Sequence, residues 1–289
     1  MPPTGFRDED EAGLLKTRSA NLLDAVLFIL VFLVSEILLE IFVLPFLNVG
    51  AKRNLLVAAE KIVSFAIVFL VVRKRLGGSL VATMPFLSAP ATSYLLVAAG
   101  VIGLHLFLEP IEAFLSRTSP SYHYYSLRLG ALYMPNDIAG TILSTIIVAP
   151  AVEELLFRGV ILRGFFQNYR ISTALLLSSL LFSLCHHNPA QFIGPFFSGV
   201  LFGAAYLRTN SVFPCLAGHM LTNGIWFFAR ANKAASELLS LGLLRGDDPV
   251  LLLVREGLGI LLVALSFLLL VLPAMWKTVA QDNDGSHHS

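Results

Sequence analysis

Residues 141–158 read TILSTIIVAPAVEELLFR, an apolar run that ends on two adjacent carboxylates and an arginine. The chain around it is 56% hydrophobic and only 13% charged, with a mean hydropathy of +0.77. Because a soluble domain carries about 25% charged residues, this composition predicts an integral membrane protein. A charge at the bilayer centre costs at least about 2.5–3.5 kcal/mol, so Glu153, Glu154 and Arg158 are candidates for a functional site.

The rest of the chain divides into further apolar stretches separated by polar turns. The sequence therefore predicts an all-α, polytopic membrane protein with about eight transmembrane helices. The eight segments are roughly 22–44, 55–72, 94–115, 138–157, 172–187, 191–207, 212–229 and 251–275. We expect a polar N-terminal tail over 1–21, a single transmembrane domain over 22–276 and a polar, disordered C-terminal tail over 277–289. The tyrosine-rich stretch 116–137 is expected to be an interfacial loop, and 231–250 a short interfacial helix.

Charge and cysteine content narrow the possible partners and location. The net charge of +1 with no basic face argues against a nucleic-acid partner and leaves the lipid bilayer as the main one. Cys185 and Cys215 lie in apolar segments and are expected to be small buried hydrophobes. A small excess of Lys and Arg in alternate loops favours both termini in the cytoplasm. Short loops and compact length favour a prokaryotic plasma membrane.

Helical spacing predicts different partners for the two glutamates. At about 100° per residue, Glu154 and Arg158 lie one turn apart on the same face, with Glu before Arg in the favourable order for an ion pair. Glu153 is rotated away and has no partner in its own helix. We therefore expect Glu154 to be structural and Glu153 to be available as a general base or acid. Pro150, one turn earlier, is expected to open the backbone so that water reaches Glu153.

Two later segments supply further groups that can act on a water molecule and a carbonyl group. Phe182 and His186 share one helical face, and His219 and Asn223 share another. A carboxylate and an imidazole can activate water, while amide and imidazole donors can stabilise an oxyanion. Together with Glu153, these side chains are the parts for attack of water on a carbonyl carbon.

The ordered motifs EExxxR (Glu153 to Arg158), FxxxH (Phe182 to His186) and HxxxN (His219 to Asn223) resemble the CAAX-protease and bacteriocin-processing family of intramembrane endopeptidases. The resemblance covers about 138–230. It implies an eight-helix membrane core around an intramembrane active site and cleavage of a membrane-anchored or lipidated protein or peptide. It also implies that Glu153 and His186 activate water and that His219 and Asn223 form the oxyanion hole. Glu154, Arg158 and Phe182 would support the site. Only the spacing from Phe182 selects His186 over the adjacent His187.

Three alternatives stay open at this stage. Glu153, His186 and His219 could supply the three protein ligands of a catalytic zinc, although no cofactor is favoured because there is no HExxH motif and Asn223 suits an oxyanion better. A small transporter or ion relay could use the buried acids Glu36, Glu40, Glu60, Glu109 and Glu112, but most of these are expected to be paired. A third alternative is a non-catalytic membrane scaffold with the same fold.

Overall fold

The computed structural model describes residues 19–42, 53–77, 86–132, 137–186, 188–231 and 249–285, and this part of the chain is helical with no strand. Each of the eight predicted apolar segments forms a helix, so the all-α prediction is confirmed. Seven of them are α1 (Leu22–Phe42), α2 (Arg53–Leu76), α4 (Ala91–Thr118), α9 (Ile171–Leu184), α10 (Ile193–Thr209), α11 (Phe213–Ala231) and α13 (Pro249–Gly285).

The remaining apolar segment forms one continuous helix made of five successive pieces. Its backbone alternates between α-helical and wider π-helical turns. The pieces are α6 (Ile138–Thr141), η4 (Ile142–Val148), α7 (Ala149–Glu154), η5 (Leu155–Leu162) and α8 (Arg163–Asn168). Because π-helical turns are rare and occur mostly at functional sites, this helix is the first place to look for one.

Among the described residues, five helical stretches are long and apolar enough to cross a membrane. They are Leu22–Phe42, Asn54–Leu76, Ala91–Thr118, Pro189–Thr209 and Val250–Ala274, and the helix Ile171–Leu184 is apolar but shorter. An apolar helix of about 20 residues matches the thickness of the hydrocarbon core. The prediction of a multi-pass integral membrane protein is therefore confirmed.

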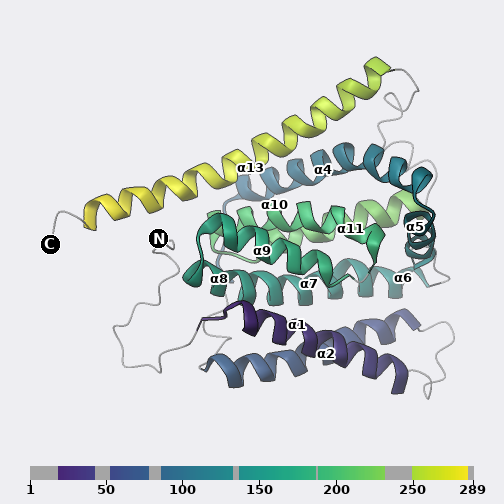
Figure 1. Ribbon diagram of the computed structural model, residues 1–289, viewed down its shortest axis with the longest axis horizontal. Coiled ribbons are helices and arrows are strands. Elements are labelled where there is room, and N and C mark those ends of the chain that lie inside the picture. The colour runs from purple at the N-terminus through teal and green to yellow at the C-terminus, as the bar shows by residue number, and fades with distance from the viewer. Residues whose placement is uncertain are drawn as a thin grey trace.

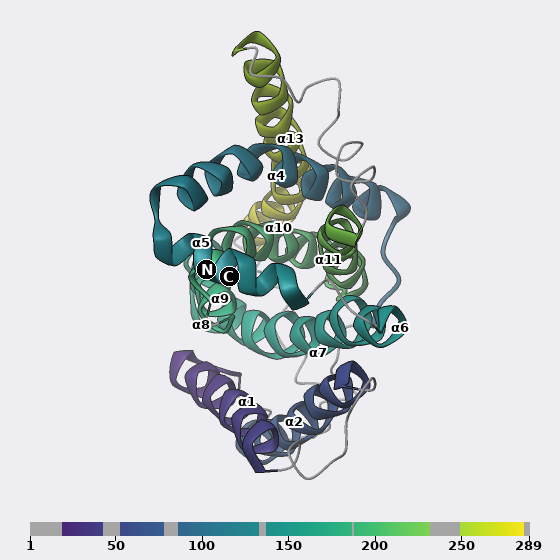
Figure 2. The ribbon, with the colours of Figure 1, turned by 90° about the vertical axis from the view of Figure 1, so that its right-hand side faces the viewer.

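The helices form a layered bundle around α7 (Figures 1 and 2). In the end-on view of Figure 2, α1 and α2 form a V on one side of α6 and α7, while α10 and α11 lie on the other side. Helices α4 and α13 pack against each other beyond α10. The glutamate-bearing α7 therefore lies between α2 and α11, and its side chains can reach both.

The α4–α13 contact depends on two glycines that allow the backbones to approach closely. A Cβ atom built on Gly103 would lie 2.9 Å from the Gly259 carbonyl oxygen, and one on Gly259 would lie 3.0 Å from the Gly103 oxygen. Small residues of this kind permit tight helix packing in membranes, where the hydrophobic effect provides little attraction between helices.

Gly103→Ala is expected to lower the thermal unfolding midpoint in detergent because the added methyl group separates α4 from α13. The matched control is Gly257→Ala on α13, where an added Cβ meets no atom within 4 Å. That variant should keep or raise the midpoint, since Ala favours helix over Gly by about 1 kcal/mol. Equal effects of the two substitutions would contradict the packing role of Gly103.

Three local predictions need correction. The fourth segment does not end at 157 but continues to Asn168, because Arg158 is 1% exposed and its charge is satisfied inside the bundle. Arg158 therefore cannot be counted as a loop charge in the orientation argument, whose bias toward cytoplasmic termini becomes smaller. The predicted 116–137 loop contains helix α5 (Pro120–Leu132), which Pro120 can begin because the first helical position needs no N–H donor.

The C-terminal tail is also more helical than predicted. Helix α13 continues through Gly285, so much of the segment 277–289 that we expected to be disordered is helical. No glycine or proline interrupts residues 274–284, and polar residues such as Lys277 and Gln281 are good helix formers. Most of the predicted interfacial helix at 231–250 lies outside the described residues.

Candidate active site

The two glutamates lie on a short α-helical turn between two π-helical stretches. Ala149 ends the first stretch, and its N–H donates to the carbonyl oxygen of Ser144, five residues earlier. The second stretch begins directly after Glu154. Wider turns on both sides change the direction in which side chains leave the helix, so Glu153 and Glu154 can face different neighbours.

Glu154 connects two helices through one oxygen atom. Its Oε1 accepts a hydrogen bond from Arg158 Nη1 at 2.8 Å, and the same atom accepts from His219 Nδ1 at 2.8 Å. Glu154 is 0% and Arg158 is 1% exposed. Arg158 Nη2 also donates to the Gly199 carbonyl oxygen at 3.3 Å. The ion pair expected from helical spacing is therefore present, and it additionally holds the imidazole of α11.

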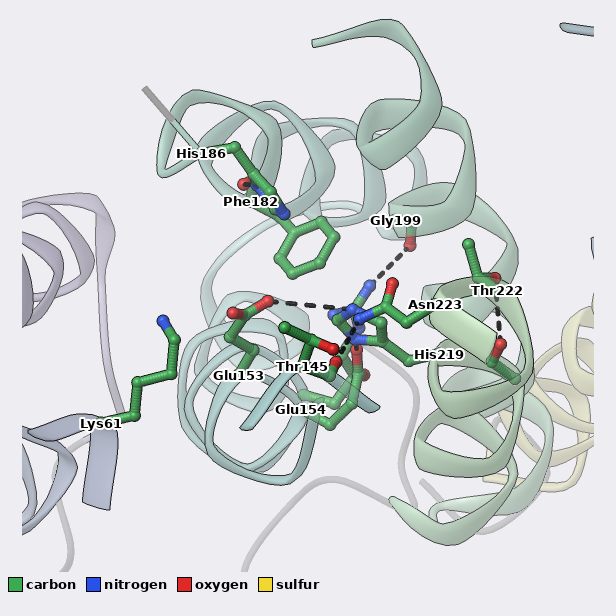
Figure 3. Close-up of polar contacts among 12 residues, drawn as sticks. Lys61, Thr145, Glu153, Glu154, Phe182, His186, Gly199, His219, Thr222 and Asn223 are labelled. Carbon is green, nitrogen blue, oxygen red and sulfur yellow. Dashed lines mark hydrogen bonds and ion pairs between the residues drawn. The ribbon is translucent and has the colours of Figure 1, made fainter. Parts of the chain in front are cut away.

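Glu153 faces a different space, which Figure 3 shows between α2, α9 and α11. Its Oε2 lies 3.9 Å from His219 Nε2, and its side chain is 17% exposed. Lys61 lies on the side of Glu153 away from His219 and is itself paired with Glu36 Oε1 at 2.9 Å. Glu153 thus lies between an imidazole on one side and a lysine ammonium on the other.

Phe182 sets the positions of the two histidines. Its ring packs edge-on against His186, with 5.0 Å between centroids, and against His219 at 5.6 Å. The guanidinium of Arg158 lies over the same ring, 4.7 Å from its centroid. Such a cation–π contact is stronger when it is desolvated. Phe182 therefore holds both imidazoles and the buried cation apart at fixed separations.

The hydrogen bonds also indicate which ring nitrogens carry protons. His186 Nδ1 lies 2.9 Å from the Phe182 carbonyl oxygen, which can only accept, so Nδ1 is the donor. In the neutral ring, Nε2 then keeps a lone pair. His219 Nδ1 faces the Glu154 carboxylate in the same way. With Glu154 ionised, His219 Nε2 donates only when the ring is a cation.

Asn223 is oriented by the helix that carries the glutamates. Its Nδ2 donates to the Thr145 carbonyl oxygen at 2.8 Å. An amide nitrogen carries two hydrogens, so one N–H remains for another acceptor. His219 lies one turn earlier on α11, so both side chains face the space beside Glu153 (Figure 3).

A cavity of about 270 Å³ adjoins these groups on the side of α4 and α5. The predicted site residues that line it are Phe182, His186, His219 and Asn223, but not Glu153. Tyr122 of α5 is buried and lines the cavity, whereas the neighbouring Tyr124 is 54% exposed. The tyrosine-rich stretch thus contributes Tyr122 and Ser126 to the cavity wall.

Residues 135–225 match the family model described as Type II CAAX prenyl endopeptidase Rce1-like. This segment is Rce1-like. The match confirms the resemblance predicted from the three motifs, and its bounds include Glu153, Phe182, His186, His219 and Asn223. The match covers about a third of the chain and includes the helix that carries the two glutamates. No curated protein and no solved structure matches the chain.

The side chains of the Rce1-like segment give a test of the zinc alternative. Within the described residues, no three His, Cys, Asp or Glu side chains are placed to hold a metal ion. The Nδ1 atoms of His186 and His219 are already bonded to Phe182 and Glu154, which leaves one nitrogen of each ring. Zinc-bound histidines are usually held in the same way, through the other ring nitrogen, so activation of water by zinc stays an alternative to direct activation by Glu153.

Three features of the site were missed by sequence reasoning. Lys61 was not among the predicted site residues, although it faces Glu153 from α2. The bond from His219 to Glu154 and the bond from Asn223 to the Thr145 carbonyl join segments 65 and 78 residues apart. No local spacing signals such contacts. The adjacent His187, whose role was left open, lies outside the described residues.

Proposed function

We propose that this protein is an intramembrane endopeptidase that hydrolyses a peptide bond in a membrane-anchored or lipidated protein or peptide. One observation carries the proposal: Glu153 of α7, His219 and Asn223 of α11, and His186 in the turn after α9 face one space beside an intramembrane cavity. The three motifs are far apart in sequence, so their convergence supports a common site. The match of residues 135–225 to an endopeptidase family model supports the same class of reaction.

In the proposed reaction, Glu153 takes a proton from water as the water oxygen attacks the carbonyl carbon of the scissile bond. His186 accepts a hydrogen bond from the same water through the free lone pair of Nε2. The carbonyl oxygen becomes an oxyanion, and the free N–H of Asn223 donates to it. His219 Nε2 is the second donor when its ring is a cation held by Glu154.

The intermediate then collapses with cleavage of the C–N bond. The proton held by Glu153 passes to the departing amine nitrogen, either directly or through His186 Nε2. The new carboxyl group keeps the water oxygen, so atoms and charge balance. Glu154, Arg158 and Phe182 do not touch the substrate in this scheme. They hold His219 and His186 at the required separation.

The cavity supports the proposed class of substrate. Its walls combine apolar residues of α4, such as Val101 and Leu104, with polar groups at the His186 end. Since α4 is long and apolar enough to span a membrane, a substrate in this cavity has its cleavage site at membrane depth. A lipid-anchored peptide or the end of a transmembrane segment meets that requirement.

The ion-relay alternative finds less support in the arrangement of the other acids. Glu36 pairs with Lys61 between α1 and α2, whereas Glu109 pairs with Arg255 between α4 and α13 at 3.3 Å. Glu109 and Glu112 line the cavity, but Glu36 and Glu60 do not. The acids are therefore divided between two places and do not mark one continuous path.

The test is a comparison of protein termini in cells that produce either the wild type or the Glu153→Gln variant. Mass spectrometry of membrane and secreted peptides should find new termini only with the wild type. The candidate substrate is then synthesised and cleaved by purified protein in liposomes. A farnesylated peptide ending in a CAAX sequence serves as the second probe. If neither the cells nor the liposomes show cleavage that depends on Glu153, the proposal is wrong.

A chelation experiment tests whether water is activated by zinc or directly by Glu153 and His186. After exhaustive dialysis against EDTA and 1,10-phenanthroline, the purified protein is expected to keep its turnover rate on the identified substrate, because Glu153 and His186 activate water directly. The measurement is kcat before and after dialysis, with the metal content determined in parallel. Loss of activity that added zinc restores would contradict metal-free water activation.

A further inference from the structure

Pro150 lies at the point where the first π-helical stretch ends. In a π-helical turn an N–H donates to the carbonyl oxygen five residues earlier, as that of Ala149 does to Ser144. The next bond in the same series would run from residue 150 to the carbonyl oxygen of Thr145. Proline has no N–H, so this bond cannot form, and the helix returns to α-helical turns in α7.

The carbonyl that loses this donor is the one that holds Asn223. Asn223 Nδ2 lies 2.8 Å from the Thr145 oxygen and comes from α11, a different helix. A carbonyl in a low-dielectric interior is costly to leave without a donor. The side-chain amide of Asn223 therefore takes the place of the missing backbone N–H.

We propose that Pro150 is a positioning residue for the oxyanion hole: by lacking an N–H, it keeps the Thr145 carbonyl free to orient the Asn223 amide. Pro150 is buried in the helix and lines no part of the cavity. It acts through Asn223 and not on the substrate. This inference rests on the proposed function, in which Asn223 donates to the oxyanion. It also replaces the earlier expectation that Pro150 opens the backbone for water.

The argument predicts how a backbone N–H at position 150 would act. In Pro150→Ala, the new N–H continues the π-helical series and donates to the Thr145 oxygen. Asn223 then has to share that oxygen with a backbone donor, which moves its amide and turns its free N–H away from the oxyanion. A misplacement on the order of 1 Å can cost about 100-fold in rate, so kcat should fall by about 10- to 100-fold with KM little changed.

A double-mutant cycle between Pro150→Ala and Asn223→Ala tests the link. Asn223→Ala alone should lower kcat by about 10²–10³-fold, as for loss of one oxyanion donor. Because Pro150 acts through Asn223, adding Pro150→Ala to Asn223→Ala should lower kcat no further. An equal fold-loss from Pro150→Ala in both backgrounds would overturn the proposal.

The thermal unfolding midpoint gives a second readout that needs no substrate. In Asn223→Ala the Thr145 carbonyl loses its donor, and Pro150→Ala supplies a new one. The change in midpoint caused by Pro150→Ala should therefore be more favourable in the Asn223→Ala background than in the wild type. The matched control is Pro273→Ala, a helix-internal proline of α13, which should shift the midpoint equally in both backgrounds. If Pro150→Ala also shifted the midpoint equally in the wild-type and Asn223→Ala backgrounds, the proposal would be overturned.

An ester at position 150 separates the missing N–H from the rigidity of the proline ring. Pro150→lactic acid, introduced by nonsense suppression, has neither ring nor N–H and should recover most of the wild-type kcat. Failure to recover it would assign the effect to the ring and overturn the proposal. Wild-type kcat in Asn223→Ala, combined with a non-additive midpoint, would instead contradict the proposed catalytic role of Asn223 and leave the coupling of Pro150 to Asn223 through the Thr145 carbonyl in place.

Discussion

Glu153→Gln protein is expected to fold like the wild type and to cleave its substrate about 10²–10⁴-fold more slowly, the usual contribution of a general base. The amide has the size of the carboxylate and fits beside His219, but it cannot take a proton from water. The measurement is kcat on the identified peptide in liposomes, with the thermal unfolding midpoint recorded on the same preparation.

The matched control is Glu40→Gln, the same chemical change inside the apolar helix α1. Glu40 is exposed in the bundle and has no place in the proposed reaction. Its variant should keep wild-type turnover. A Glu153→Gln variant that turns over at the wild-type rate would sink the proposed mechanism. Equal losses in the two variants would show that the effect comes from removing a membrane charge and not from the loss of a base.

The largest effect on stability is expected from Arg158→Met. Removing one partner of a fully buried ion pair typically costs about 3–5 kcal/mol, because the other charge is left uncompensated. Here the remaining charge is Glu154, which is 0% exposed and would keep only the bond from His219. The measurement is the free energy of unfolding in mixed detergent micelles, taken from denaturant titration.

The double variant Glu154→Gln with Arg158→Met shows whether charge is the cause. With both charges removed, the loss of stability should be smaller than in Arg158→Met alone. Turnover should stay low, since a neutral amide does not stabilise a cationic His219. Arg255→Met is the control for a less buried pair, because its partner Glu109 is 41% exposed. That variant should lose less stability than Arg158→Met, and a similar loss would contradict the importance of burial.

Much of the fold could be predicted because its signal is local. Apolar runs of helical length identified each of the eight segments, and composition identified the membrane. The errors came from assuming that charged and polar residues lie in water, outside the membrane-spanning helices. Arg158 was placed at the end of its helix. Inside the bundle, however, Glu154 neutralises its charge and the Gly199 carbonyl oxygen accepts a hydrogen bond from it. Helix α5 was taken for a loop because its tyrosines resemble an interfacial belt.

The candidate site could be predicted in part for the same reason. Helical spacing was enough to pair Glu154 with Arg158 and to separate Glu153 from both. It could not show that one Glu154 oxygen also holds His219, or that Asn223 bonds the Thr145 carbonyl. Those contacts depend on how α7 and α11 pack, and packing is decided by the whole bundle. The assignment of reaction roles to Glu153, His186, His219 and Asn223 stays a prediction that the variants above will test.

The shared Glu154 oxygen also bears on how the protein is made. Segment 138–168 emerges from the ribosome before α11, and His219 has no carboxylate to hold it until the two have packed. A nascent or partly inserted chain therefore lacks an oriented His219, and Asn223 lacks its Thr145 acceptor. The proposed site is therefore completed only by the step that also packs α7 against α11.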